Sequence, residues 1–96
     1  GNPLATTQGR GTLLELDLPQ AQPVNYLILQ EDIHQGERIR RYVVEAEVEG
    51  RWQPVAQGTS VGHKKIDRIS PVTTRKLRLH VLEAVAPPVV RKLAAY

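Results

Sequence analysis

The chain has 96 residues, of which 41% are hydrophobic and 24% charged, and it contains no Cys, Met or Phe. One small domain fits this length, whereas a (β/α)8 barrel of roughly 250 residues does not. The lack of Cys excludes disulfide bonds, thiolate metal sites and Cys nucleophiles. No apolar run approaches the ~20 residues needed to cross a bilayer, and no signal-peptide pattern opens the chain, so we expect no membrane partner.

Charge is divided unevenly between the two halves of the chain. Residues 1–50 carry four Lys or Arg against eight Asp or Glu, whereas residues 51–96 carry nine against two. Paired strands with interleaved charges explain this asymmetry most simply, and a basic face for an acidic partner is the alternative. The basic pairs Lys64-Lys65, Arg75-Lys76 and Arg91-Lys92 would be the candidates for nucleic acid. One Trp and three Tyr are few for a base-stacking platform, so we expect no nucleic-acid partner.

The chain divides into a short leading segment and one domain. Residues 1–11 are predicted to form an exposed linker or a trimmed start. Within them, Gly9-Arg10-Gly11 precedes a strand pattern rather than a helix, so it is no phosphate loop and is interpreted as a flexible entry. Residues 12–96 are predicted to form a single β-sandwich domain.

Period-two alternation predicts strands in the first half of this domain. Leucines alternate with acids over residues 14–18, as in a half-buried strand, and the apolar run over residues 24–29 indicates a central strand. Pro19 and Pro23 are predicted to bracket a short loop between these strands. The polar segment 31–37 is predicted to be a second loop.

The second half continues the strand pattern. Alternation over residues 39–48 is followed by the tight connection Glu49-Gly50-Arg51, which predicts a β-hairpin. Ser70-Pro71 indicates another turn, and apolar residues alternate with basic ones over residues 77–81. The apolar residues of the tail 89–96 fit both the two-residue period of a strand and the 3.6-residue period of a helix, so an edge strand and a helix both remain open. About seven short strands at regular spacing predict an all-β antiparallel sandwich or barrel.

The residues that could perform chemistry form no common catalytic or metal-binding pattern. Three histidines are present, at His34, His63 and His80. Their spacing does not suit a shared metal ion, so no metal or other cofactor is predicted. Glu31 and Asp32 are adjacent acids, but neighbours on an extended chain point to opposite faces and make a poor acid/base pair. The residues alone therefore indicate a binding or structural module without an identified ligand.

Three segments of the chain resemble a known family. Residues 24–42 read VNYLILQEDIHQGERIRRY, residues 52–65 read WQPVAQGTSVGHKK, residues 72–79 read VTTRKLRL, and the chain closes on Tyr96. In this order the segments resemble the C-terminal region of the family 29 glycoside hydrolases, the α-L-fucosidases. The resemblance covers roughly residues 12–96.

This resemblance implies a discoidin-like domain, the coagulation-factor V/VIII type C β-sandwich in its jelly-roll form. In these fucosidases the domain follows a catalytic barrel that holds the catalytic residues, so the resemblance implies that this chain is no enzyme by itself. The implied partners are the catalytic barrel of the same parent protein and a fucosylated or galactose-type glycan. Calcium often braces this fold through earlier loops, for which there is little room before Thr12, so no metal is expected. The implied location is the periplasm or the extracellular space of a bacterium.

The same resemblance suggests a contact site. Related family 32 carbohydrate-binding modules bind galactose-type sugars through loops at one end of the sandwich, using an Arg just after the strand that matches residues 26–29. This chain has Gln30 there, and a Gln amide cannot supply the bidentate contact of an Arg. The residues implied in carbohydrate or interdomain contact are Gln30, Glu31, His34, Gln35, Arg38 and Trp52.

Simpler interpretations of these residues stay open. The charges of the loop could serve only solubility, with Gly36 permitting its turn. Trp52 follows a hairpin turn and is interpreted first as a core or edge-packing residue, with a stacking surface as the alternative. The chain could thus be an accessory sandwich docked on a catalytic barrel or a free-standing glycan-binding module.

Overall fold

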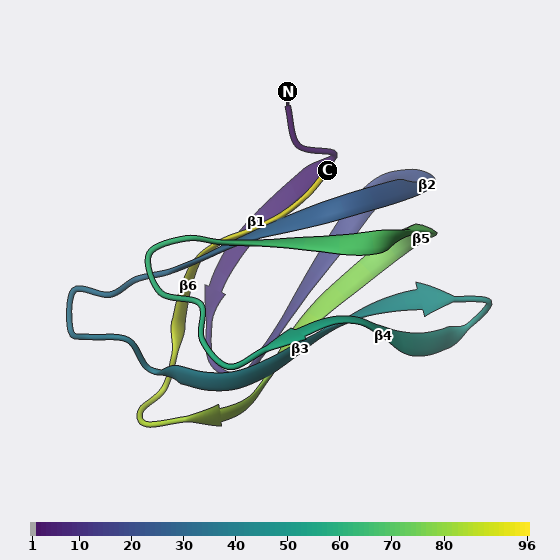
Figure 1. The fold of residues 1–96 in the computed structure, drawn as a ribbon. Helices are drawn as coiled ribbons and strands as arrows, with labels where there is room; N and C mark the ends of the chain where they lie inside the picture. Colours follow the sequence, from purple (N-terminus) through teal and green to yellow (C-terminus); the bar gives the residue numbers. More distant parts are fainter. Residues whose placement is uncertain (1) are drawn as a thin grey trace.

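The computed structural model describes residues 2–96, and within that range it consists of strands and connections without any helix. The six strands are β1 (Ala5–Arg10), β2 (Leu13–Glu31), β3 (Ile39–Val48), β4 (Arg51–Gly58), β5 (Lys65–Ala84) and β6 (Val89–Ala95). All neighbours are antiparallel, in the order β1-β6-β2-β5-β3-β4 (Figure 1). The all-β antiparallel prediction is confirmed, with six strands in place of about seven. The described residues hold no helix that could cross a membrane.

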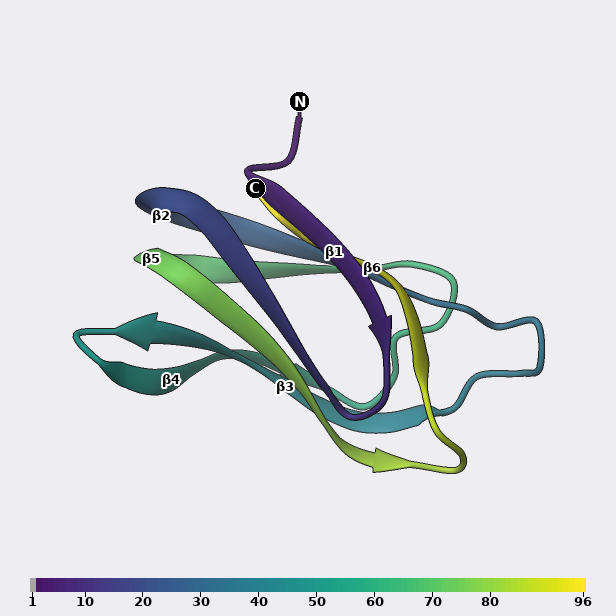
Figure 2. The same ribbon diagram turned by 180° about the vertical axis from the view of Figure 1, so that it is seen from behind.

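Two long strands, β2 and β5, are shared by two layers. Residues Leu13–Asp17 of β2 pair with Lys76–His80 of β5, and residues Gln22–Leu29 pair with Lys65–Thr74. Between these two stretches both strands turn over together, as Figures 1 and 2 show from opposite sides. One arm of the pair extends into β6 and β1, which we call the β1–β6 layer. The other arm extends into β3 and β4, the β3–β4 layer.

The bend explains why the predicted number of strands was too high. Pro19 and Pro23 were predicted to bracket a loop, and Ser70-Pro71 was predicted to be a turn, but all of them lie inside the continuous strands β2 and β5. The ladder between the two strands is irregular at the corner, where residues 18–21 bulge out of register. Proline is tolerated at such bulges because it has no N–H group to contribute to the ladder. The prolines at each bend therefore have the same sequence pattern as a break between two strands.

The segment predicted to be a linker contains an edge strand. Ala5–Arg10 forms β1 and pairs with β6, so the linker prediction for residues 1–11 was wrong over this stretch. Its sequence, ATTQGR, has no clear apolar alternation. The strand is held by the backbone edge that β6 offers, which local sequence does not reveal. Gly1 lies outside the described residues.

The hairpin and the C-terminal tail are both strands. Glu49 and Gly50 have φ values of 53° and 78°, the left-handed pair that a two-residue type I′ turn requires, which confirms the predicted β3–β4 hairpin. The ambiguous tail forms β6, which lies between β1 and β2. A central position in the layer explains why its last residues, Leu93 to Ala95, are fully buried.

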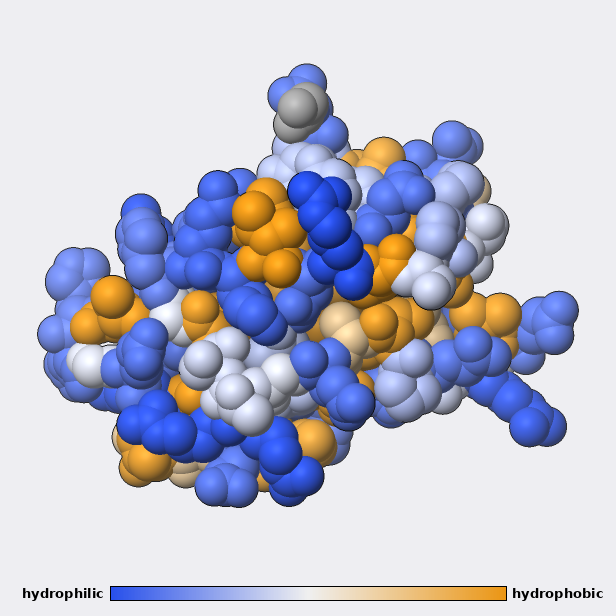
Figure 3. Space-filling model, in the orientation of Figure 1, coloured by the Kyte–Doolittle hydropathy of each residue, from blue (hydrophilic) through white to orange (hydrophobic). Residues whose placement is uncertain are grey.

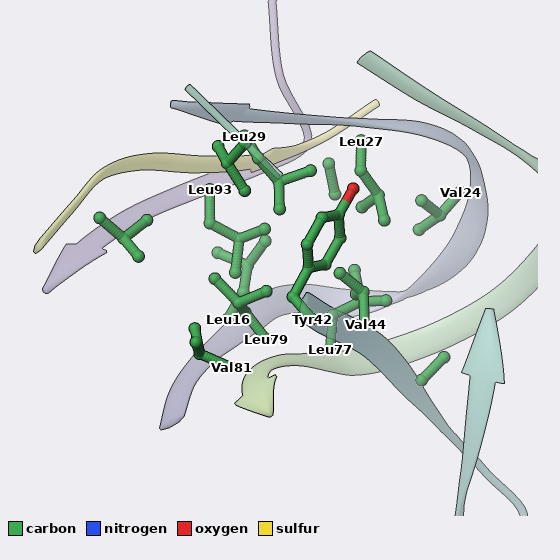
Figure 4. Packing of buried hydrophobic residues seen from close by; sticks show 14 of the residues in the cluster. Leu16, Val24, Leu27, Leu29, Tyr42, Val44, Leu77, Leu79, Val81 and Leu93 are labelled. Atoms are coloured by element: carbon green, nitrogen blue, oxygen red, sulfur yellow. The ribbon is translucent and has the colours of Figure 1, made fainter. Parts of the chain in front are cut away.

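The hydrophobic core lies between the two layers. The alternating apolar side chains predicted to face inward are almost fully buried there, which confirms the period-two reading (Figure 4). From the β3–β4 layer they include Leu16, Leu18, Tyr42, Val44, Ala46, Leu77 and Leu79, and from the β1–β6 layer Val24, Leu27, Leu29 and Leu93.

Tyr42 also joins the two layers by hydrogen bonds. It lies on β3 with no exposed surface, and its hydroxyl donates to Asp67 Oδ2 at 2.5 Å. Lys65 Nζ donates to the Tyr42 hydroxyl and to Asp67 Oδ1, both at 2.9 Å. Burial, followed by the hydrogen bond to Asp67, raises the pKa of Tyr42 to about 12. Burial lowers the pKa of Lys65, but its bonds to Tyr42 and Asp67 outweigh that effect and raise it overall.

The ring of Tyr42 needs a glycine above it. An added methyl group at Gly58 on β4 would lie 2.8 Å from Cε1 and the hydroxyl oxygen of Tyr42. We predict that Gly58→Ala lowers the free energy of unfolding by about 1–3 kcal/mol, as overpacked cores do, measured by urea denaturation. Gly9→Ala is the control, since its methyl would meet only the tip of the Leu14 side chain. That change should cost less than about 1 kcal/mol, and equal losses would contradict the prediction.

Ionisation of Tyr42 predicts a loss of stability in alkali. The unfolded chain ionises this phenol near pH 10.0 and the folded chain near 12, so the contribution is complete below pH 10.0 and is lost as pH rises toward 12. The difference corresponds to at most about 3 kcal/mol. Urea denaturation between pH 9 and pH 12 should show this decline, and Tyr42→Phe should show a shallower one. Identical pH profiles would rule out this role for the phenol.

Candidate functional site

The loop that joins β2 to β3 carries three of the six predicted contact residues, His34, Gln35 and Arg38. Residues 32–38 turn at Gly36, which has a φ of 90° and donates its N–H to the Ile33 carbonyl at 2.9 Å. At the start of the loop, Asp32 N–H donates to the Val89 carbonyl of β6 at 2.9 Å. The loop is therefore tied both to itself and to the neighbouring strand.

Glu31 is a buried residue that holds this loop in place. It is the last residue of β2, is 1% exposed, and its Oε2 accepts hydrogen bonds from the backbone N–H groups of Arg38 (2.6 Å) and Ile39 (3.1 Å). Its Oε1 is buried and has no hydrogen-bond partner within residues 2–96. The carboxylate thus holds the two ends of the loop together and does not face the solvent.

Asp32 and His34 form a pair at the loop surface. Asp32 Oδ1 accepts the backbone N–H of His34 at 3.1 Å and lies 2.6 Å from His34 Nδ1. These contacts, the backbone bond first, hold the pKa of Asp32 below its ordinary value, and the positive charge of Arg91 acts in the same direction. Asp32 is therefore an ionised carboxylate at neutral pH.

Arg38 is fixed by two neutral acceptors. Its Nη1 donates to the Pro87 carbonyl at 2.7 Å, in the connection between β5 and β6, and its Nη2 donates to Gln35 Oε1 at 2.6 Å. Arg38 and Gln35 help to line a pocket of about 200 Å³. The lining residues are Arg10, Asp32, His34, Gln35, Arg38 and Val89.

The structure brings together three of the predicted contact residues and adds two that were not among them. His34, Gln35 and Arg38 share the pocket, while Asp32 and Arg10 complete it. Arg10 reaches the pocket because β1 pairs with the start of β6, an arrangement hidden by the linker prediction. Arg10 could have been identified only from the pairing of β1 with β6, which no local sequence pattern reveals.

The other predicted residues lie elsewhere. Gln30 faces the outer side of the β1–β6 layer, where it lines a separate groove with Arg91 and Lys92. Trp52 lies on β4 next to the β3–β4 turn, at the opposite end of the molecule from the loop (Figure 1). Its ring is covered by the Arg78 guanidinium, 4.2 Å from the ring centroid, so Trp52 is an edge-packing residue here.

The pocket offers binding groups rather than a catalytic pair. Glycoside hydrolysis ordinarily uses two carboxylates on either side of the scissile bond. Here Asp32 is the one carboxylate of the lining, since Glu31 is sealed beneath the loop. In the part of the chain that the structure describes, no three His, Cys, Asp or Glu side chains gather as metal ligands would.

A second surface feature is apolar. Leu13, Leu82 and Val85 are 53%, 43% and 65% exposed. Leu82 and Val85 line a shallow groove. Residues 86–88 of the β5–β6 connection, together with Gly11 and Thr12, also line it. Figure 3 shows one face as mostly hydrophilic with separate hydrophobic patches, one of them at the lower left where this connection runs in Figure 1. We call Leu13, Leu82 and Val85 the apolar end.

Comparison with known proteins points in one direction. No protein-family model matches the chain. Alpha-L-fucosidase 1 of Arabidopsis thaliana is 33% identical over 87 residues, which cover 88% of this chain and 17% of the relative. A crystal structure of a Bacteroides thetaiotaomicron protein assigned as an α-L-fucosidase is 47% identical with a TM-score of 0.96, covering 99% of this chain and 22% of that one.

A third likeness concerns the fold alone. The chitosan-binding module 1 of a chitosanase/glucanase from Paenibacillus sp. IK-5 has a TM-score of 0.73 at 16% identity, covering 95% of this chain and 74% of the module. The chain therefore shares its fold with this module, and it spans about a fifth of the length of the fucosidases that it matches. The resemblance inferred from its sequence is confirmed.

The brace formed by Glu31 gives a prediction for the loop. Glu31→Ala should lower the free energy of unfolding by about 2–4 kcal/mol, because two backbone N–H groups lose a charged acceptor. Amide hydrogen exchange of Arg38 and Ile39 should accelerate in the same variant. Gln30→Ala, one residue away on the outer face, should change stability by no more than about 0.5 kcal/mol. Similar effects of the two changes would disprove the bracing role.

Proposed function

We propose that this chain, which matches a short region of the family 29 α-L-fucosidases, is a non-catalytic C-terminal accessory β-sandwich of such an enzyme. Its role is to support the catalytic barrel of the same protein and to add carbohydrate contacts beside it. The observation that carries the proposal is the match, at 47% identity and a TM-score of 0.96, to 22% of a fucosidase-assigned chain. Catalysis then belongs to the remaining part of such an enzyme, since the pocket of this domain has a single ionised carboxylate.

The apolar end is the surface that we assign to docking. Leu82 and Val85 are exposed and line the same groove, and contiguous exposed apolar surface marks interaction sites. The matched fucosidases are about five times as long as this chain, so the catalytic domain of the same protein is the natural occupant. Covering Leu82 and Val85 would remove apolar surface from water, and each Å² buried would stabilise the docked state by roughly 25 cal/mol.

The second candidate is a free-standing carbohydrate-binding module for galactose- or fucose-type glycans. It is supported by the shared fold of the chitosan-binding module and by the polar pocket at the loop end of the sandwich. Either role would place the protein where it meets glycans, in the periplasm or outside the cell.

The experiment compares the longer protein with and without this domain. We predict that the open reading frame containing these residues encodes a barrel, and that removing residues 1–96 lowers the melting temperature of the barrel. The isolated chain should release no nitrophenol from a chromogenic fucoside. Leu82→Ser in the longer protein should lower its stability, while Ile66→Ser, at a comparably exposed residue on the other layer, should not.

Three results would go against the proposal. Turnover by the isolated chain would place catalytic residues in this domain. A reading frame without a barrel would remove the partner. An unchanged melting temperature after removal of the domain, combined with millimolar binding of galactose or fucose by the isolated chain, would support the second candidate instead.

A further inference from the structure

We propose that the pocket beneath loop 32–38 binds an acidic sugar residue, a saccharide that carries a carboxylate or a sulfate. This inference rests on the carbohydrate contact of the proposed function and names its ligand class. The polar side chains that line the pocket are Arg10, Asp32, His34, Gln35 and Arg38.

Hydrogen-bond donors dominate among these side chains. Arg38 carries five N–H donors, and its two described bonds go to the neutral oxygens of Pro87 and Gln35, so its charge is not neutralised by them. Because Gln35 Oε1 accepts one of these bonds, its amide nitrogen is left with two donors. The Arg10 guanidinium makes no hydrogen bond or ion pair with any of residues 2–96. A cluster of donors with excess positive charge favours a group that only accepts, such as a carboxylate or a sulfate.

The negative charge in the lining is too small to cancel this excess. Asp32 is the one carboxylate there, and its Oδ1 is occupied by both contacts with His34. Arg91 adds a third positive charge close enough to affect the pKa of Asp32. The Glu31 carboxylate is buried beneath the loop and engaged by two backbone N–H groups.

Asp32 explains why the ligand is a sugar rather than a free anion. Its Oδ2 accepts no hydrogen bond from residues 2–96 and is available to a hydroxyl group beside the anionic group. The volume of about 200 Å³ lies below the ~300–1,000 Å³ of pockets for drug-sized ligands, so it suits one sugar ring. The loop is already fixed by Glu31, which reduces the entropy lost on binding.

The test is an NMR titration of the ¹⁵N-labelled 96-residue chain. The acidic ligands are galacturonate, glucuronate and galactose 6-sulfate, which separate the carboxylate source from the sulfate source. Galactose is the neutral control, and sodium acetate and sodium sulfate are the free-anion controls. We expect shifts confined to Arg10 and residues 32–38, and at least one acidic sugar should bind about tenfold more tightly than galactose or the free anions.

Two matched variants test the electrostatic part. Arg10→Gln removes a charge that contributes no hydrogen bond to the described fold, and it should weaken acidic-sugar binding about fivefold to tenfold. Arg51→Gln removes the same charge at the exposed β3–β4 turn and should leave the affinity unchanged. Equal weakening by both variants would show only a general charge effect and would overturn the proposal.

Other outcomes also decide against it. Equal affinity for galactose and the acidic sugars, or for acetate and sulfate, would show a neutral-sugar site or a simple anion site. No shifts with any sugar, together with destabilisation of the longer protein by Arg10→Gln, would show that a protein carboxylate of the catalytic domain fills the pocket. That last result would overturn the acidic-sugar site and leave the accessory role intact.

Discussion

The pairing of β2 with β5 around a common bend is the constraint on which both layers depend. The two strands remain partners on either side of the corner, so neither can bend without the other. Three prolines, Pro19, Pro23 and Pro71, lie in these strands near the corner. They remove N–H donors where the ladder is already irregular, so bending leaves fewer backbone groups in need of a partner. With the bend in place, each layer needs only two more strands to enclose the core.

The bend also determines where the pocket forms. It sends the second half of β2 toward the end of the sandwich where β1 ends and β3 and β6 begin. Arg10, Asp32, Arg38 and Pro87, which lie far apart in the sequence, meet there. Glu31 then joins the end of β2 to the start of β3 through two backbone hydrogen bonds. The pocket is therefore a product of the whole topology rather than of a single motif.

The sequence predicted those features that depend on neighbouring residues. Alternation over residues 39–48 and 77–81 identified the inward faces of β3 and β5, and Glu49-Gly50 identified the hairpin turn, because side-chain period and positive φ are local properties. The bends in β2 and β5 were not predicted, because proline signals a break equally well when a long partner strand continues across it. β1 was missed because the free edge of β6 holds it.

The same limit applied to the site. The loop 31–37 was predicted from its polar sequence, but the sequence could not distinguish the orientations of consecutive residues. Gln30 faces an outer groove and Glu31 faces the interior, since successive residues of a strand point to opposite sides. Arg10 entered the pocket only through long-range pairing.

The connection between β5 and β6 links the two surfaces to which we assign functions. The Pro87 carbonyl accepts the hydrogen bond that orients the Arg38 guanidinium into the pocket, and Val85, two residues earlier, belongs to the apolar end. A domain that covers Val85 therefore constrains the backbone on which Arg38 depends. If docking and sugar binding favour the same position of this connection, each strengthens the other by the same factor, because coupling between two binding sites is reciprocal. An accessory domain built in this way would bind its glycan most tightly when seated on its catalytic partner.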